Sequence, residues 1–365
     1  MSAKNLTEPF GRRLRRLRER LDAVGADAFI ETFLINIQYL TGFTGSAGVL
    51  VVTPERAVFL TDARYTIQAR EEVKLAQVQI VRGSVLDAAG TMLKRAGRLR
   101  VGYAPSRMSV LQKQKLARSG GSGIRWLQRE DLVEGIRSVK DDGEIATMRK
   151  AARIAEESIR SVLAMVKPGV KEGDIAAEID YHMHKGGASG PSFDTIVASG
   201  KRSALPHAQP TDKRVRKNEL VVLDLGAILR GYCSDITRTL FVGRAPARVL
   251  GWYRAVLEAQ QAARNVVRDG VKAADVDAAA RAVLAKSGLG LYFTHSTGHG
   301  LGREVHEPPR LSRESGDILR AGQVVTLEPG IYVEGVGGIR IEDDVLVQAN
   351  GCDGITTIDR ELLEL

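Results

Sequence analysis

Five residues of this chain have the types and surroundings of a metal site. They are Asp224, Asp235, His299, Glu328 and Glu342. Acidic side chains are depleted in strands, yet each of these carboxylates lies in or beside a segment with the pattern of a strand. Carboxylates gathered in one cleft repel each other, and divalent cations remove that repulsion. A set of oxygens with one imidazole suits hard or borderline ions, so these residues predict a two-metal hydrolase.

The carboxylates could instead be unrelated acids at strand edges. Asp224 argues against this, because it directly follows the apolar run 220–223, which has the composition of a buried strand. We therefore favour metal binding.

An internal repeat in the second part of the chain indicates how the carboxylates are positioned. Residues 166–177 match residues 267–278 at a constant offset of 101, and residues 223–226 resemble 327–330 at a slightly longer offset. Two copies are too few for a solenoid. They predict a duplicated helix–helix–strand unit folded about a pseudo-twofold axis, with two carboxylates in each half.

Each pair of carboxylates is expected to lie on a hairpin. An ungapped hairpin whose turn is centred between residues 229 and 230 would put Asp224 directly opposite Asp235, with Cβ atoms about 5 Å apart. Glu328 and Glu342 are symmetric about Gly335, which lies in a glycine-rich stretch. Two such hairpins meeting at the axis would bring all four acids together.

The elements that carry this site predict an α+β fold in two domains, residues 1–137 and 138–365. In the first domain, an amphipathic helix is expected over residues 8–24 and a hairpin over 49–53 and 57–61. The glycine-rich stretch 36–48 is expected to be a turn or loop. No catalytic constellation is apparent in this domain.

Composition limits the function classes. The 365 residues are 44% hydrophobic and 27% charged, which is typical of a soluble globular protein. Two cysteines, Cys233 and Cys352, cannot form a disulfide framework and indicate a reducing compartment. No apolar run approaches the roughly 20 residues that span a bilayer, and no signal peptide is apparent, so we expect a cytoplasmic protein without a membrane partner.

The net charge of +9 raises the question of nucleic acid binding. Arginines crowd residues 12–20, but they alternate with leucines at helical spacing and no aromatic residues are interleaved to stack on bases. A solvated helix face explains this stretch better than a nucleic acid site.

Further histidines accompany His299. His295 and His306 lie with it within twelve residues, and His207 occurs in the stretch 204–208. A lone histidine is usually structural, but this density favours an active-site role, with His299 as the single nitrogen ligand.

The chain resembles the pita-bread metallopeptidases, and within them the Xaa-Pro peptidase branch of aminopeptidase P and prolidase. The resemblance rests on the five ligands and on residues 192–200, 231–239, 295–302, 327–332 and 338–343. Residues 39–48 and 61–65 resemble the creatinase-type N-terminal domain of the same branch. The resemblance implies a pita-bread catalytic domain over 138–365, preceded by a creatinase-type α/β domain over 1–137.

The resemblance also implies roles for individual residues. Asp224 and Asp235 would hold one metal, His299 and Glu328 the other, and Asp235 and Glu342 would bridge the two around a hydroxide. Glu328 would also shuttle a proton. His306 would bind the substrate and stabilise developing charge, while His207 and His295 would line the proline side of the pocket. Arg340 would orient a ligand, although a purely structural salt bridge stays open for it.

The expected reaction is cleavage of the Xaa-Pro bond at the N-terminus of peptides by an Xaa-Pro aminopeptidase. The alternative is an Xaa-Pro dipeptidase, or prolidase, and the sequence does not separate the two. The first domain argues against methionine aminopeptidase, and the intact ligand set argues against a non-enzymatic binding module. Manganese is the expected metal, with cobalt or zinc compatible. By analogy with this family we also expect a homodimer.

Overall fold

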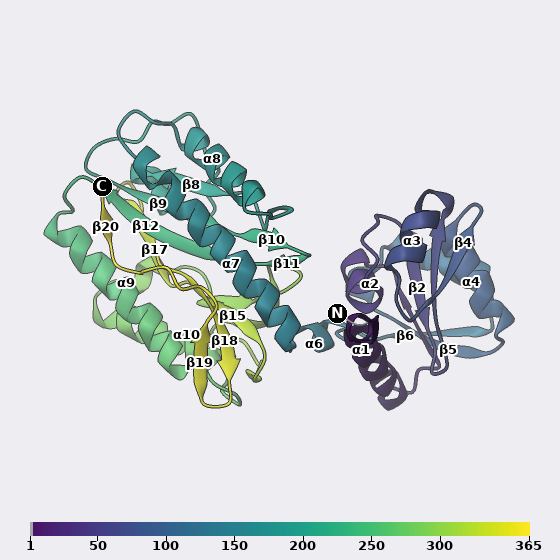
Figure 1. The fold of residues 1–365 in the computed structure, drawn as a ribbon. Helices are drawn as coiled ribbons and strands as arrows, with labels where there is room; N and C mark the ends of the chain where they lie inside the picture. The colour runs from purple at the N-terminus through teal and green to yellow at the C-terminus, as the bar shows by residue number, and fades with distance from the viewer. Residues whose placement is uncertain (1–2) are drawn as a thin grey trace. The chain divides into compact units, whose positions relative to one another are not determined.

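A computed structural model describes residues 3–365 of the chain, which form two compact units divided between Arg137 and Ser138 (Figure 1). Each unit combines helices with sheets, so the predicted α+β class is confirmed. In the described residues, no helix is both long enough and apolar enough to cross a membrane.

The first unit is built on a six-stranded sheet with strand order β4-β3-β2-β1-β5-β6. Its strands are β1 (Ala28–Glu31), β2 (Val49–Val52), β3 (Ala57–Asp62), β4 (Gln77–Val81), β5 (Leu99–Tyr103) and β6 (Ile124–Gln128). Its helices are α1 (Ala3–Ala23), α2 (Leu34–Thr41), α3 (Thr66–Glu72), α4 (Val85–Arg95), α5 (Val110–Gly120) and α6 (Glu134–Arg137), with 3-10 turns η1 (Ala63–Tyr65) and η2 (Pro105–Arg107).

Side chains that alternate along the strands separate two cores in this unit. Phe29 packs on one face with leucines of α1, while Ile30 packs on the other face with Leu93 of α4 and Leu116 of α5. The period of two along β1 therefore places helices on both faces of the sheet. The expected hairpin is confirmed, since β2 pairs antiparallel with β3.

The expectation of a loop over residues 36–48 is wrong in its first part. Helix α2 runs through Thr41 and ends at Gly42, which takes the left-handed conformation with φ 87°. Glycine reaches that conformation without a steric penalty, so it terminates this helix rather than marking a loop from the start.

The second unit holds the four long helices α7 (Asp142–Val162), α8 (Glu172–Lys185), α9 (Ala247–Val266) and α10 (Ala273–Lys286). Short 3-10 turns are η3 (Leu163–Met165), η4 (Gly200–Ala204) and η5 (Gly290–Tyr292). The strands of its first half are β7 (Gly190–Pro191), β8 (Ile196–Ser199), β9 (Glu219–Leu225), β10 (Ala227–Leu229), β11 (Tyr232–Cys233) and β12 (Ile236–Val242). Those of its second half are β13 (Gly298–Gly300), β14 (Glu307–Leu311), β15 (Val324–Leu327), β16 (Gly330–Val333), β17 (Gly337–Arg340), β18 (Asp343–Gln348), β19 (Gly351–Gly354) and β20 (Leu363–Glu364).

The internal repeat is visible in the structure of this unit. Helices α8 and α10 begin and end 101 residues apart, at the offset found in the sequence. One core joins α7 and α8 to β8, β9 and β12, and a second joins α9 and α10 to β15, β17 and β18. Figure 1 shows the strands between these two helix pairs. Duplication therefore explains the architecture.

The first predicted hairpin has a different register. Asp224 lies opposite Thr237, not opposite Asp235. The turn is formed by Arg230 and Gly231, both with positive φ (52° and 79°), so its centre lies one residue later than expected. A two-residue turn of this kind requires positive φ at both positions, and Gly231 accepts it readily.

The second predicted hairpin is confirmed around Gly335. Gly330 pairs with Arg340 in β16–β17, and Leu327 pairs with Asp343 in β15–β18. The pairs of both ladders are symmetric about Gly335. The same register therefore places Glu328 across from Glu342, at a position where neither ladder has a backbone pair.

The segment after residue 355 returns to the first half of this unit. Strand β20 runs parallel to β12, with Leu363 opposite Leu240. The amide of Leu365 donates to the Phe241 carbonyl at 2.9 Å. The strand that follows Asp235 is therefore flanked by β9 on one side and by β20 on the other.

Candidate active site

The structure brings the five predicted metal-binding residues to one cavity of about 650 Å³ in the second unit. The cavity is lined by Phe193, Ile196, Pro206, His207, Asp224, Asp235, His295, Ser296, His299, Val305, His306, Glu307, Pro308, Arg310, Asp317, Glu328, Arg340 and Glu342. All five residues lie on strands or on the short joints between strands. Rigid elements from both halves of the repeat therefore position the cluster.

Three members of the cluster have ligand atoms within metal-binding reach of one another, and a fourth lies close to one of them. Ligand atoms of Asp235, His299 and Glu342 all lie within 4.8 Å. Nε2 of His299 is 3.3 Å from Oε1 of Glu328 and 3.8 Å from Oδ2 of Asp235. The fifth member, Asp224, lines the same cavity and is bound by Arg340.

Burial makes this cluster electrostatically unfavourable by itself. Desolvation, followed by repulsion from neighbouring carboxylates, raises the pKa of Asp235 and of Glu342 well above ordinary values. Desolvation also raises the pKa of Glu328 to about 8. Oδ1 of Asp224 and Oδ1 of Asp235 are buried without a hydrogen-bond partner in the described part of the chain. Orphaned carboxylate oxygens facing one cavity fit a site built for divalent cations.

His299 presents one nitrogen to this cluster. Its Nδ1 lies 3.0 Å from the carbonyl oxygen of Gly300, which fixes the proton on that nitrogen and leaves the Nε2 lone pair facing the carboxylates. Desolvation lowers the pKa of His299 to about 4, so the imidazole is neutral near pH 7. A neutral imidazole with a free Nε2 is the form that coordinates a metal.

A chain of hydrogen bonds connects the cluster to the pocket wall. Arg340 donates to Asp224 and, at 2.8 Å, to the hydroxyl of Tyr332. That hydroxyl is also 2.8 Å from Nε2 of His295, whose Nδ1 is 2.8 Å from the carbonyl oxygen of Ser296. Desolvation lowers the pKa of His295 to about 4. Both nitrogens of this neutral ring are thus engaged, so His295 serves as a fixed wall of the pocket.

The other two histidines predicted for the site, His306 and His207, are less enclosed. His306 is exposed, and its ring centroid is 4.3 Å from that of His299. The carboxylate of the next residue, Glu307, accepts from the amide of Arg303 at 2.8 Å and from Lys140 at 3.2 Å. These contacts hold the loop that carries His306. His207 is an exposed residue on the cavity lining.

Threonines orient two of the carboxylates. Thr237 donates to Oε2 of Glu342 at 2.6 Å, and Thr326 donates to Oε1 of Glu328 at 3.2 Å. Thr237 is the residue opposite Asp224 in the observed register. The shift of the hairpin therefore puts a hydroxyl donor where a second carboxylate had been expected.

Sequence reasoning missed two residues of the cavity region. Tyr332 sits in an apolar strand and resembles a core residue, and only its hydroxyl contacts reveal its place beside the site. Arg310 lines the cavity from β14, but it follows two prolines, and prolines argue against a strand when the sequence is taken alone. Arg303 and Arg313 lie nearby in the sequence, so nothing distinguished Arg310 from an ordinary surface arginine.

Comparisons with known proteins agree with this geometry. The family model for metallopeptidase family M24 matches residues 146–349, which include all five cluster residues. The model for the creatinase/prolidase N-terminal domain matches residues 13–139. The pita-bread fold and the creatinase-type domain expected from the sequence are thereby confirmed.

Individual relatives are similar along nearly their whole length. A solved structure described as an Xaa-Pro dipeptidase from Bacillus anthracis has a TM-score of 0.93 and 37% identity, covering 98% of this chain and 100% of that one. An X-Pro aminopeptidase structure from Thermotoga maritima has a TM-score of 0.89 and 36% identity, covering 97% and 100%. An Xaa-Pro dipeptidase from Pyrococcus furiosus is 36% identical over 96% of this chain and 99% of its own. This chain belongs to metallopeptidase family M24.

Proposed function

We propose that this protein is an Xaa-Pro dipeptidase that works with two divalent metal ions. The expected aminopeptidase activity is less well supported than its alternative, because relatives in the comparisons are named mainly as Xaa-Pro dipeptidases or prolidases. The observation that carries the metal-dependent hydrolase is the buried cluster of four carboxylates and one neutral imidazole.

The residues present fit two cations. Asp224 and Asp235 would hold one, His299 and Glu328 the other, and Asp235 with Glu342 would bridge them. When bound, such a pair supplies Lewis acidity and a water that is deprotonated near neutral pH. Manganese suits this set of oxygens with one nitrogen, and cobalt or zinc are the other candidates.

The protein's own groups would bind the peptide and move protons. Glu328 keeps 17% of its side chain exposed, so it can carry a proton to the departing proline nitrogen. The exposed imidazole of His306 would hydrogen-bond the carbonyl group under attack. His207 and the fixed ring of His295 would enclose the proline, whose nitrogen carries no hydrogen for a backbone contact.

Arg310 supplies a reason for preferring dipeptides. In an Xaa-Pro dipeptide the carboxylate is attached directly to the proline, whereas in a longer peptide a neutral amide takes its place. Arg310 lines the cavity and is exposed, and its guanidinium can bind a carboxylate through two parallel hydrogen bonds. We therefore infer that Arg310 recognises the substrate carboxylate.

The test compares Ala-Pro with Ala-Pro-Ala after chelation and reconstitution with manganese, cobalt or zinc in turn. We expect metal-dependent hydrolysis of Ala-Pro and little of Ala-Pro-Ala. Arg310→Gln should raise KM for Ala-Pro about tenfold or more, as expected for a lost charged contact. Arg313→Gln is the matched control, since this exposed arginine lines a neighbouring hollow instead.

Aminopeptidase activity is the second candidate, and the similarity to the Thermotoga maritima X-Pro aminopeptidase favours it. Efficient release of alanine from Ala-Pro-Ala by the wild-type protein would establish it and refute the dipeptidase proposal. The homodimer stays a prediction from family resemblance, and light scattering that gives the mass of one chain would refute it.

A further inference from the structure

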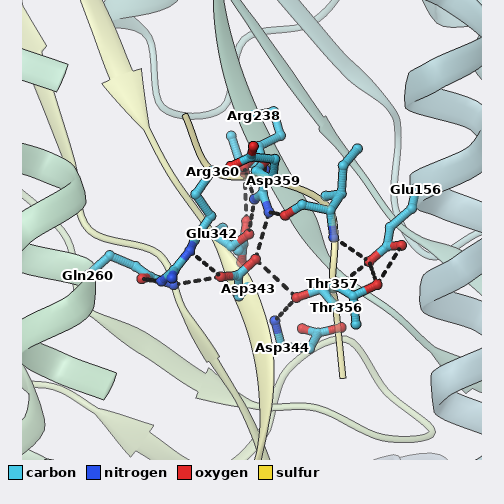
Figure 2. A network of polar contacts seen from close by, with 12 residues as sticks. Glu156, Arg238, Gln260, Glu342, Asp343, Asp344, Thr356, Thr357, Asp359 and Arg360 are labelled. Atoms are coloured by element: carbon cyan, nitrogen blue, oxygen red, sulfur yellow. Dashed lines mark hydrogen bonds and ion pairs between the residues drawn. The ribbon is translucent and has the colours of Figure 1, made fainter. Parts of the chain in front are cut away.

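A buried polar network connects β12 and β18 next to the candidate ligand Glu342, and its centre is the pair Arg238–Asp343 (Figure 2). Arg238 is 4% exposed. Its N–H groups donate to the carbonyls of Thr237, Glu342, Ile358 and Asp359 and to the carboxylate of Asp343. A guanidinium has five N–H donors, and each is matched here by one acceptor.

Asp343 gathers contacts from other parts of the chain. Its carboxylate accepts from Arg238 at 2.7 Å, from Gln260 of α9 at 2.9 Å and from Thr356 at 3.1 Å. Nε of Arg360 lies 3.7 Å from its second oxygen. Figure 2 shows Asp343 among these neighbours, beside Glu342. The pair thus joins β12, β18, α9 and the segment 356–360.

The network bears on one candidate ligand in particular. Glu342 falls between β17 and β18, where no ladder holds its backbone. Its carbonyl instead accepts from Arg238 at 2.6 Å, and its amide donates to the Thr237 carbonyl at 3.2 Å. Asp235, the other proposed bridging residue, precedes Thr237 by two positions in the same segment.

We propose that Arg238 and Asp343 are positioning residues that set the spacing between the two bridging carboxylates, Asp235 and Glu342. The inference rests on the metal site of the proposed function. Groups that orient ligands from behind must hold them within a few tenths of an ångström, and their loss weakens metal binding. Segment 356–360, far from the cavity in sequence, is in this sense a structural component of the metal site.

The geometry explains why an arginine occupies this position. Lysine would keep the charge but offers three donors from a single point, too few for the five acceptors that Arg238 binds on three separate segments. The carbonyl of Glu342 or those of residues 358 and 359 would then lose their donor. Arg238→Lys is therefore a disruptive change here despite conserving charge.

The experiment measures manganese affinity by calorimetry on metal-free protein, together with the EPR signal of the bound ions. Arg238→Lys and Asp343→Asn should bind manganese about 10- to 100-fold more weakly and change the signal of the coupled pair. The controls are Arg149→Lys and Asp353→Asn, a more exposed arginine–aspartate pair at the same 2.7 Å in which Arg149 binds Asp353 and the Gly354 carbonyl of β19. They should bind within about twofold of wild type.

Arg360→Gln is a further variant that keeps the inference testable if Arg238→Lys or Asp343→Asn does not fold. Arg360 is 30% exposed on its side chain, so its replacement should fold, and it should weaken manganese binding in the same direction by a smaller factor. Variants that are folded by circular dichroism and less stable, but bind manganese like wild type, would overturn the inference. A wild-type chain that binds no divalent metal would instead refute the proposed function.

Discussion

Both units of this protein bury carboxylates, but they neutralise them differently. In the first unit, Glu31 and Glu134 lie on either side of Asn36, whose amide donates to both at 2.7 and 2.8 Å. Arg107 lies 3.2 Å from Glu134, and Arg137 donates to the Asn36 carbonyl oxygen. One amide thus bridges the two acids, one cation contacts Glu134, and a second cation contacts the amide oxygen.

In the second unit, the four carboxylates of the candidate metal cluster share the cavity with the buried cation Arg340, which pairs directly with Asp224. Buried carboxylate oxygens of Asp224 and Asp235 have no hydrogen-bond partner among the described residues. In the first-unit cluster of Glu31, Asn36 and Glu134, one carboxylate oxygen, Oε2 of Glu134, is in the same situation. The comparison teaches that a count of buried acids is not enough to identify a candidate metal site. A better indicator is that buried acids lack enough positively charged neighbours.

The comparison is tested most strongly by removing one bridging acid. Glu342→Gln keeps the shape of the side chain but removes a charge that the proposed cations need. A bound metal pair stabilises the transition state by several kcal/mol, so kcat/KM for Ala-Pro should fall about 1000-fold. Manganese binding should weaken in parallel. Activity within tenfold of wild type would show that the cluster does not work as proposed.

Adding an acid to the first-unit cluster of Glu31, Asn36 and Glu134 should lower stability by a free energy nearly as large as the loss of activity predicted for Glu342→Gln. Asn36→Asp replaces the bridging amide with a third carboxylate, which loses both donated hydrogen bonds and adds a buried like charge. We expect the free energy of unfolding of the first unit to fall by roughly 3 to 4 kcal/mol at pH 8. Urea unfolding followed by Trp126 fluorescence in a Trp252→Phe background measures this unit, because the chain has two tryptophans.

Glu31 should make the first unit sensitive to pH. Desolvation, the largest cause, raises the pKa of this 2% exposed carboxyl from 4.5 to about 7. The folded state therefore binds the proton more tightly than the unfolded chain. The resulting stabilisation is complete below about pH 4.5 and is lost as pH rises through about 7, a change on the order of 3 kcal/mol.

The measurement is the urea midpoint of Trp126 fluorescence between pH 5 and 8, compared with Glu31→Gln in the same background. The variant cannot ionise at this position, so its stability should change less over that range. An equal pH dependence in both proteins would assign the effect to other groups.

The smallest expected effect concerns Arg340, the arginine that binds Asp224 of the candidate metal cluster. Tyr332→Phe removes the hydroxyl that connects Arg340 to His295. Loss of a hydrogen bond to a charged group costs about 1.5 to 3 kcal/mol, so kcat/KM should fall roughly 10- to 150-fold. Tyr232→Phe is the control, because this hydroxyl bonds Glu144 outside the cavity at 2.7 Å. Equal losses in both variants would argue against a role for the connection.

Much of this architecture could be predicted from the sequence because its signals are local or periodic. The repeat offset of 101 located α8 and α10, and the unusual carboxylates in apolar segments pointed to one cluster. The register of β9 and β12 could not be predicted as readily, since it depends on one positive-φ turn at Arg230 and Gly231. A shift of the turn centre by one residue moved Thr237 into the place assigned to Asp235.

Contacts between distant segments were the least predictable. Neither Tyr332 nor Arg238 carries a pattern that distinguishes it from a core aromatic residue or a strand arginine. Their roles become visible only in the folded chain, where Tyr332 of β16 contacts His295 and Arg238 of β12 contacts the carbonyl of Ile358. The preference between dipeptides and longer peptides is of the same kind, since it depends on which groups face the far end of the cavity.

The parallel pairing of β20 with β12 has a consequence for synthesis on the ribosome. The first unit ends at Arg137 and has every strand of its sheet by then, so it can fold while the rest is translated. The metal site must wait for residues 358–364, which hold Arg238 and complete the sheet beside it. At about 5 to 20 residues per second, the nascent chain spends on the order of ten seconds or more with its acidic cluster unassembled. The proposed metal ions would therefore bind late, after the last strand of this sheet has been translated.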